Sequence, residues 1–182
     1  MTMDRLQRAA IICRLTEKLR EGGSWCGETH IQKAAFLLGD GRHVPLGWRF
    51  VLYKYGPFSF DLREELGELR AEDFLRLEPP PSGYGPPLEV DQRGRKVMEQ
   101  FNDTIDEHEG AVADVVEFVG TRGVSGLERL ATGVYLVLHK GTREDEDLAR
   151  ELCDIKPHVS EAGAREAVAR GREFLSGSGV PS

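Results

Sequence analysis

The chain has 182 residues, of which 40% are hydrophobic and 30% charged, a composition that predicts an ordinary globular protein of one domain with an extension or two small domains. Its net charge of −7 is uneven, because residues 1–60 carry nine Lys/Arg against five Asp/Glu (+4) and residues 61–182 carry fifteen against twenty-six (−11). The acidic part argues against a surface that wraps nucleic acid. Short apolar runs, an N-terminus without a signal-peptide pattern and three widely spaced cysteines predict a cytoplasmic protein without membrane contact.

The first ninety residues predict helices separated by short extended segments. Apolar side chains recur at helical spacing, and Ser59 is placed to cap a helix. Gly56-Pro57 predicts a break between an extended aromatic run and that helix, because proline lacks an N–H and disfavours helical geometry before it. The predicted elements are a helix over 4–21, a helix over 28–38, an extended segment over 48–55, a helix over 60–70, and strands over 74–77 and 88–90.

These elements predict a mainly α fold with a small β hairpin, an α+β class. Two strands joined by a Pro- and Gly-rich loop after a set of helices are the outline of a winged helix, so we expect a winged-helix-like domain over residues 4–90.

The remainder predicts a helical extension over residues 91–176 and a disordered tail over 177–182. Asp91 is placed to cap the first of these helices, and Ser125 with Glu128 resembles a capping box. The later helices are predicted over 110–119, 125–139, 144–155 and 160–175.

The sequence predicts no enzyme, no metal site and no cofactor. The five histidines never recur four residues apart, no Gly-x-Ser-x-Gly turn is present, and the glycine-rich stretch at 39–47 lacks the Gly-Lys-Ser/Thr of a phosphate loop.

DNA binding is the alternative that the winged-helix outline raises. Arg93, Arg95 and Lys96 follow the predicted wing and are the candidate backbone contacts. Charge disfavours this alternative, because the helix over 60–70 is acidic and the wing over 78–89 has no basic residue.

Two motifs resemble a known family. HIQKAAFLL, followed by FVLYKYGPFSFDLREELGELRAEDFL, resembles the SocA-like (Panacea) antitoxin domain and its YwgA-like branch. The matching residues are Ile31, Gln32, Lys33, Phe36, Leu37, Tyr55, Gly56, Pro57, Phe58, Ser59, Leu62 and Leu66. The resemblance covers about residues 5–175, and its most specific part is the Tyr-Gly-Pro block.

The resemblance implies a non-catalytic protein-binding module, an antitoxin-like or phage-defence-associated prokaryotic adaptor that binds and restrains a toxin or effector. A winged-helix DNA-binding transcriptional regulator is the alternative, and a homodimer is compatible with either.

Four clustered aromatic residues predict where a protein partner binds. Tyr53, Tyr55, Phe58 and Phe60 cannot all face one core if two lie on a strand and two turn a corner. At least one is therefore expected at the surface, beside Tyr84 of the proline-rich loop. The expected partner-binding residues are Lys33, Tyr53, Lys54, Tyr55, Phe58 and Tyr84, with the two lysines pairing with acidic groups of the partner.

Overall fold

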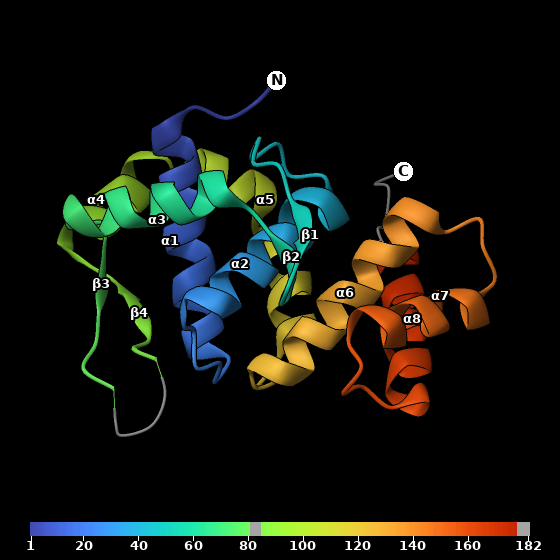
Figure 1. The fold of residues 1–182 in the computed structure, drawn as a ribbon. Helices are drawn as coiled ribbons and strands as arrows, with labels where there is room; N and C mark the ends of the chain where they lie inside the picture. Colours follow the sequence, from blue (N-terminus) through green and yellow to red (C-terminus); the bar gives the residue numbers. More distant parts are fainter. Residues whose placement is uncertain (81–84, 178–182) are drawn as a thin grey trace.

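The computed structural model describes residues 1–80 and 85–177, and over these residues the protein is mainly helical, with two short antiparallel hairpins (Figure 1). This confirms the mainly α class. The elements are α1 (Arg5–Glu21), α2 (Glu28–Phe36), a π-helical turn (Leu37–Gly41), β1 (Val51–Tyr53), β2 (Gly56–Phe58), α3 (Phe60–Ala71), β3 (Leu75–Leu77), β4 (Leu88–Val90), α4 (Gln92–Gln100), α5 (Asn102–Val119), α6 (Val124–Lys140), α7 (Asp145–Ile155) and α8 (Glu161–Ser176).

The long helix α1 lies at the centre of the first half of the chain. Its N-cap is Asp4, whose carboxylate accepts from the Gln7 N–H at 2.9 Å while the Gln7 side chain accepts from the Asp4 N–H at 3.0 Å. This reciprocal capping box satisfies two backbone donors that a helix start leaves free. Helices α2, α4 and α5 and strand β4 pack around α1, which buries most of its middle turns.

The aromatic run that precedes α3 is a hairpin, which corrects the expectation of one extended segment ended by Gly56-Pro57. Strand β1 pairs antiparallel with β2, with Val51 opposite Phe58 and Tyr53 opposite Gly56. The chain therefore reverses at Lys54 and Tyr55. Gly56 permits this reversal because its φ is +96°, a backbone angle that residues with a Cβ rarely adopt.

Helix α3 begins as the sequence predicts. The Ser59 hydroxyl accepts from the Leu62 N–H at 3.2 Å, which confirms Ser59 as its N-cap. The second hairpin pairs β3 with β4, with Leu75 opposite Val90 and Leu77 opposite Leu88.

Helices α4 and α5 contact α1, whereas α6, α7 and α8 form a compact group on the other side of the β1–β2 hairpin (Figure 1). Asp91 caps α4 as predicted, with its carboxylate accepting from the Gln92 N–H at 2.7 Å. The predicted division at residue 90 stays a prediction, and so does the tail, whose residues 178–182 lie outside the described part of the chain.

Close contact between α6 and α8 depends on glycine. A Cβ on Gly133 would lie 2.4 Å from the Ala167 carbonyl oxygen, and one on Gly171 would lie 3.0 Å from the Val134 nitrogen. The two helices therefore approach backbone to backbone. The expected capping box of α6 is wrong, because the N-cap is Gly123 and Glu128 is instead turned inward.

Candidate functional site

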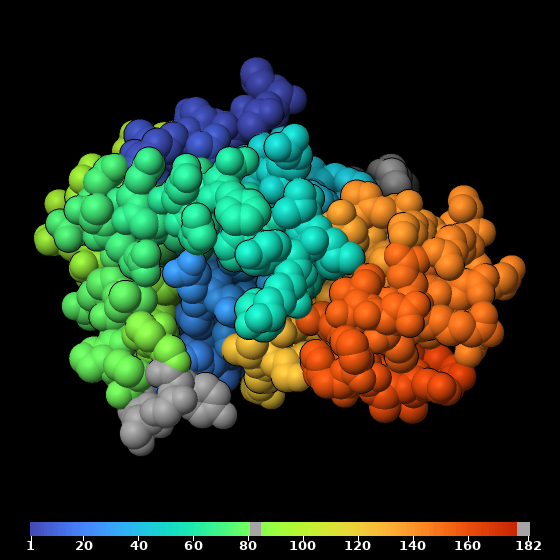
Figure 2. Space-filling view, in the orientation of Figure 1, coloured from blue at the N-terminus to red at the C-terminus, as the bar shows by residue number. Residues whose placement is uncertain are grey.

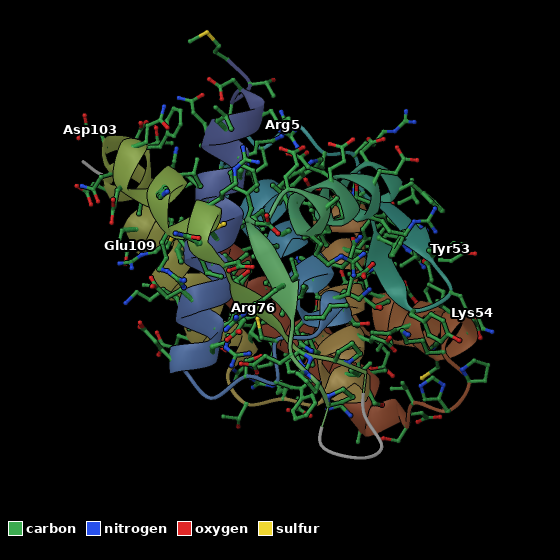
Figure 3. All side chains as sticks on the ribbon, turned by 90° about the vertical axis from the view of Figure 1, so that its left-hand side faces the viewer. Arg5, Tyr53, Lys54, Arg76, Asp103 and Glu109 are labelled. Carbon is green, nitrogen blue, oxygen red and sulfur yellow. The ribbon has the colours of Figure 1, made fainter. Side chains whose placement is uncertain are left out.

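The β1–β2 hairpin and the first residue of α3 together form a partly exposed cluster of aromatic rings. We call Tyr53, Phe58 and Phe60 the ring cluster. The three rings contact one another, with centroid distances of 5.8 Å (Tyr53–Phe58), 5.6 Å (Tyr53–Phe60) and 5.1 Å (Phe58–Phe60). Tyr53 is 52% exposed and Phe60 43% exposed, while Phe58 is half-buried. In the turned view the hairpin lies at the edge of the molecule, with Tyr53 directed outward (Figure 3). The expectation that the aromatic residues cannot all be buried is thus confirmed.

Beneath the ring cluster, α2 holds β2 and the start of α3 through buried polar groups. The Gln32 amide donates to the Ser59 carbonyl at 2.9 Å and accepts from the Ser59 N–H at 3.0 Å. The Lys33 ammonium donates to the Pro57 carbonyl at 3.0 Å. Gln32 and Lys33 are each 1% exposed. Two adjacent residues of one helix therefore fix three polar groups of the hairpin's second strand and the residue after it.

Helix α6 closes the other side of the hairpin. A Cβ on Gly56 would lie 2.9 Å from the Thr132 hydroxyl and 3.3 Å from the Glu128 carbonyl oxygen. Glycine at this position therefore serves two purposes: it adopts the positive φ that the turn requires, and it lets the hairpin come close to α6.

Three charged side chains are buried behind Gly56. Lys33, Glu128 and Lys156 are 1%, 8% and 2% exposed, and the Lys156 ammonium lies 3.8 Å from the Glu128 carboxylate. Burial lowers the pKa of Lys33 to about 8, against the opposing effect of Glu128. Burial likewise raises the pKa of Glu128, although Lys156 and Lys33 favour its charged form. We call Gln32, Lys33, Glu128, Thr132 and Lys156 the buried polar cluster.

Lys33 was expected to pair with a partner protein, and this expectation is wrong. Its side chain is enclosed by β2 and α6, and its ammonium is bound to the chain's own Pro57 carbonyl. The residue type alone favours a surface role, because a single lysine in a helix is usually exposed. A better signal was the pair Gln32-Lys33 on the same turn as the apolar Ile31 and Ala34.

The other predicted partner-binding residues lie at the surface or outside the described residues. Lys54 and Tyr55 form the exposed turn of the hairpin, with the Lys54 ammonium 5.2 Å from the centroid of the Tyr55 ring. Tyr84 lies outside the described residues. Its neighbour Gly85 accepts a hydrogen bond from the Trp25 indole at 2.9 Å, so this end of the loop is held on the segment between α1 and α2.

The three candidate DNA-contacting residues are exposed on α4, but two of them already hydrogen-bond to backbone carbonyls of the chain itself. Arg93 donates to the Glu72 carbonyl at 3.1 Å, and its guanidinium lies 4.7 Å from the Phe74 ring centroid. Arg95 donates to the Val90 carbonyl at 3.0 Å. Lys96 is exposed beside them.

The hairpin that corresponds to the predicted wing has its own internal charge pair. Arg76 of β3 is bound to Glu89 of β4, and the exposed Arg76 is seen near the middle of the turned view (Figure 3). Helix α3 exposes Asp61, Glu64 and Glu68. The face that a winged helix would turn to phosphate therefore carries mostly negative charge.

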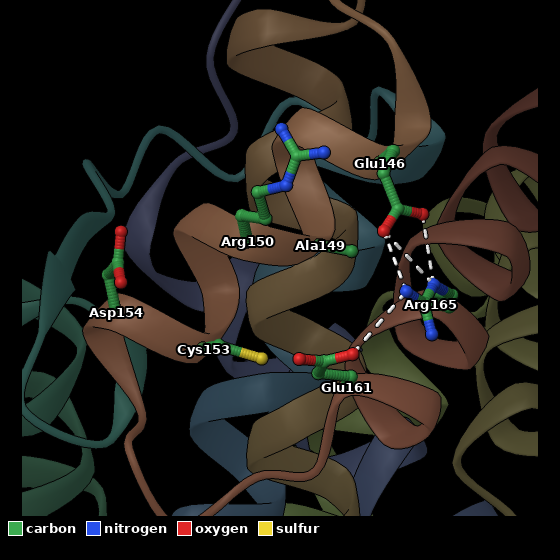
Figure 4. A pocket seen from close by; sticks show the side chains of 7 residues that line it. All are labelled: Glu146, Ala149, Arg150, Cys153, Asp154, Glu161 and Arg165. Carbon is green, nitrogen blue, oxygen red and sulfur yellow. Dashed lines mark hydrogen bonds and ion pairs between the residues drawn. The ribbon is translucent and has the colours of Figure 1, made fainter.

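A hollow of about 390 Å³ lies between α7 and α8 (Figure 4). Its charged lining is largely paired, because Arg165 binds Glu146 at 2.7 Å and lies 3.5 Å from Glu161. The Cys153 thiol donates to the Val159 carbonyl at 3.7 Å. The Glu146–Arg165 pair joins α7 to α8, and the Cys153 contact joins α7 to the segment between the two helices, so both have a structural role.

Over the described residues the protein has neither a cluster of metal ligands nor a membrane-spanning helix. Within 1–80 and 85–177, no group of three or more His, Cys, Asp or Glu side chains is placed to hold a metal ion. No helix in the same ranges combines the length and apolar character needed to cross a bilayer.

Comparison with known proteins adds no family: no protein-family model matches the chain, and no curated protein matches it. The resemblance to SocA-like antitoxins therefore stays a prediction that depends on the two motifs. The structure does show how these motifs meet, since Gln32-Lys33 of the first motif binds Pro57 and Ser59 of the second.

Proposed function

We propose that the protein is a non-catalytic protein-binding module, an antitoxin-like or phage-defence-associated adaptor that binds and restrains a toxin or effector in the cytoplasm. The observation that carries this proposal is the ring cluster: Tyr53 of β1 and Phe60 at the start of α3 are both over 40% exposed, and the backbone between them is fastened from below by buried hydrogen bonds.

Large aromatic side chains at the surface are the residues that most often dominate protein interfaces. They bury much apolar area, and they lose little side-chain entropy because they have few rotatable bonds. Here the rings already contact one another and their backbone is held by α2, so binding would cost little further ordering. Tyr55, which is 52% exposed at the tip, extends this surface.

The class of partner comes from the resemblance. Both of its motifs form one unit in this fold, with Gly56, Pro57 and Ser59 held by Gln32, Lys33 and α6. A winged-helix-like arrangement of α1–β4 belongs to the same proposal.

Co-expression with the product of the adjacent gene tests the proposal. We expect the wild-type chain to co-purify with that product and to relieve any growth arrest that it causes. The Tyr53→Ser/Phe60→Ser variant should lose both effects while keeping the wild-type circular dichroism spectrum and melting temperature.

Leu77→Ser is the matched control, because Leu77 is an equally exposed apolar side chain (43%) on the other hairpin. It should behave as wild type. Unchanged co-purification by the Tyr53→Ser/Phe60→Ser variant would overturn the ring cluster as the binding surface, and absence of any bound protein in the wild-type sample would overturn the protein-binding function.

A DNA-binding regulator is the weaker alternative, favoured only by the exposure of Arg93, Arg95 and Lys96 on α4. Against it stand the acidic face of α3 and the internal hydrogen bonds of Arg93 and Arg95. Backbone contacts of this kind would give weak, salt-sensitive and sequence-independent binding.

A further inference from the structure

The outer edge of β1 offers unpaired backbone groups. In an antiparallel ladder, opposed residues alternate between pairs that exchange hydrogen bonds and pairs that do not. Leu52 lies opposite Pro57, which has no N–H to donate, so this pair is a non-bonded one. The Leu52 N–H and C=O must therefore point away from β2, whereas those of Val51 and Tyr53 point toward it.

Within the described residues nothing else pairs with this edge. The sheet consists of β1 and β2 alone. Strand β2 packs on α6 and α2, and the main contacts of β1 are with β2. The space-filling view shows the hairpin at the front of the molecule, with α3 on one side of it and α7 and α8 on the other (Figure 2). An edge strand in this position is a template for a further strand.

The surroundings of the edge indicate what kind of strand fits. Val51 is 39% exposed and lies opposite Phe58, and Val51 and Tyr53 share one face of β1. Residues 49–60 contain Arg49 and Lys54 and no Asp or Glu, a local charge of +2 in a chain of net charge −7. Both cationic side chains are exposed and flank β1.

We propose that β1 binds an extended segment of the partner protein as a third strand, and that this segment alternates apolar with acidic residues. The Leu52 N–H and C=O hydrogen-bond to its backbone, its apolar side chains lie over Val51 and the ring cluster, and its carboxylates face Arg49 and Lys54. This inference rests on the proposed protein-binding function and names the chemistry of the partner.

Amide hydrogen exchange of the full chain tests the proposal. The probe is a synthetic peptide in which valine and glutamate alternate. In the free protein we expect slow exchange at Val51 and Tyr53 and fast exchange at Leu52. Saturating peptide should slow Leu52 by at least about tenfold, since a populated hydrogen bond must open before exchange. A peptide N-methylated on every amide, which has no N–H to donate on either edge, should leave the Leu52 rate unchanged.

Charge reversal supplies the second test. Arg49→Glu/Lys54→Glu should weaken peptide binding by about tenfold or more, whereas Lys96→Glu, on the distant helix α4, should change it less than about twofold. Equal losses in both variants would mean non-specific attraction and overturn the proposed site.

The outcomes separate this inference from the proposed function. Binding of the adjacent gene's product with no change at Leu52 overturns third-strand pairing and leaves the adaptor function standing. Leu52 exchange that is already slow, and that speeds up on dilution, shows that a second copy of this chain occupies the edge and overturns the proposed occupant. Slowing of Leu52 by the peptide supports the inference even where the adjacent gene's product does not bind.

Discussion

Replacing Lys33 by methionine should change how the stability of the protein depends on pH. Methionine keeps an apolar stem of similar length and removes the buried ammonium. The pKa of Lys33 is about 8 in the folded chain, below its ordinary value of 10.5, mainly because burial disfavours the charged form. Between these two values the unfolded chain binds a proton that the folded chain does not. The free energy of unfolding of the wild type therefore gains a contribution that rises with pH across this window.

The size of the effect follows from these two pKa values. From about pH 7 to about pH 9.5 the Lys33 contribution should grow by about 2 kcal/mol. Other groups also titrate there, since burial raises the pKa of Cys13 and of Cys26 to about 12 and the unfolded thiols ionise earlier. These groups are common to both proteins. The difference between wild type and Lys33→Met isolates Lys33, and the lost bond to Pro57 adds only an offset independent of pH.

Urea denaturation at a series of pH values, followed by tryptophan fluorescence, measures this difference. Lys54→Met is the control, because Lys54 is an exposed lysine on the same hairpin and its variant should run parallel to wild type. Parallel curves for wild type and Lys33→Met would refute the reasoning, because they would mean that Lys33 keeps an ordinary pKa in the folded chain and is not enclosed as described.

Three further outcomes are expected. Gly56→Ala should lower the free energy of unfolding by about 2–4 kcal/mol, because Gly56 has a positive φ and contacts α6 closely. Gly67→Ala, on an open helix surface, should instead raise it by up to about 1 kcal/mol. Thermal melts measure both variants, and equal effects would contradict the packing described. Cys13 and Cys26 should stay unlabelled by a thiol reagent until the chain unfolds, as mass spectrometry can show, because both are buried and their raised pKa disfavours the thiolate. Duplex DNA should bind weakly in a mobility-shift titration near physiological salt, and nanomolar sequence-selective binding that Lys96→Glu abolishes would favour the regulator instead.

The helices were predictable where local chemistry determines them. Ser59 and Asp91 each stand directly before a helix and cap it with a side-chain oxygen, as their positions in the sequence indicate. The α5 start was missed, because the helix begins at Asn102 rather than near residue 110. Its first turns are polar and lack the apolar repeat on which the prediction depended.

The hairpin of β1 and β2 was not predictable in the same way. Each strand has three residues, too few for an alternating pattern to be recognised. Gly56-Pro57 is typical of an interruption, whereas here it pairs with β1 and is held in place by contacts far away in the sequence, from Lys33 and from α6. The role of Glu128 is hidden from the sequence for a similar reason, because its partner Lys156 lies 28 residues later, directly after α7.

The two faces of this hairpin have the opposite of the usual polarity, and this is the strongest physical reason to expect a partner. The inner side rests on ammonium and amide groups of Lys33 and Gln32, whose burial is costly unless each is hydrogen-bonded. The outer side presents Tyr53 and Phe60 to water, although rings of this size are the side chains that gain most from burial. Stability of the isolated chain alone would favour the reverse arrangement. A partner protein that covered these rings would remove the exposed apolar area, and the buried hydrogen bonds would already hold the hairpin in place for it.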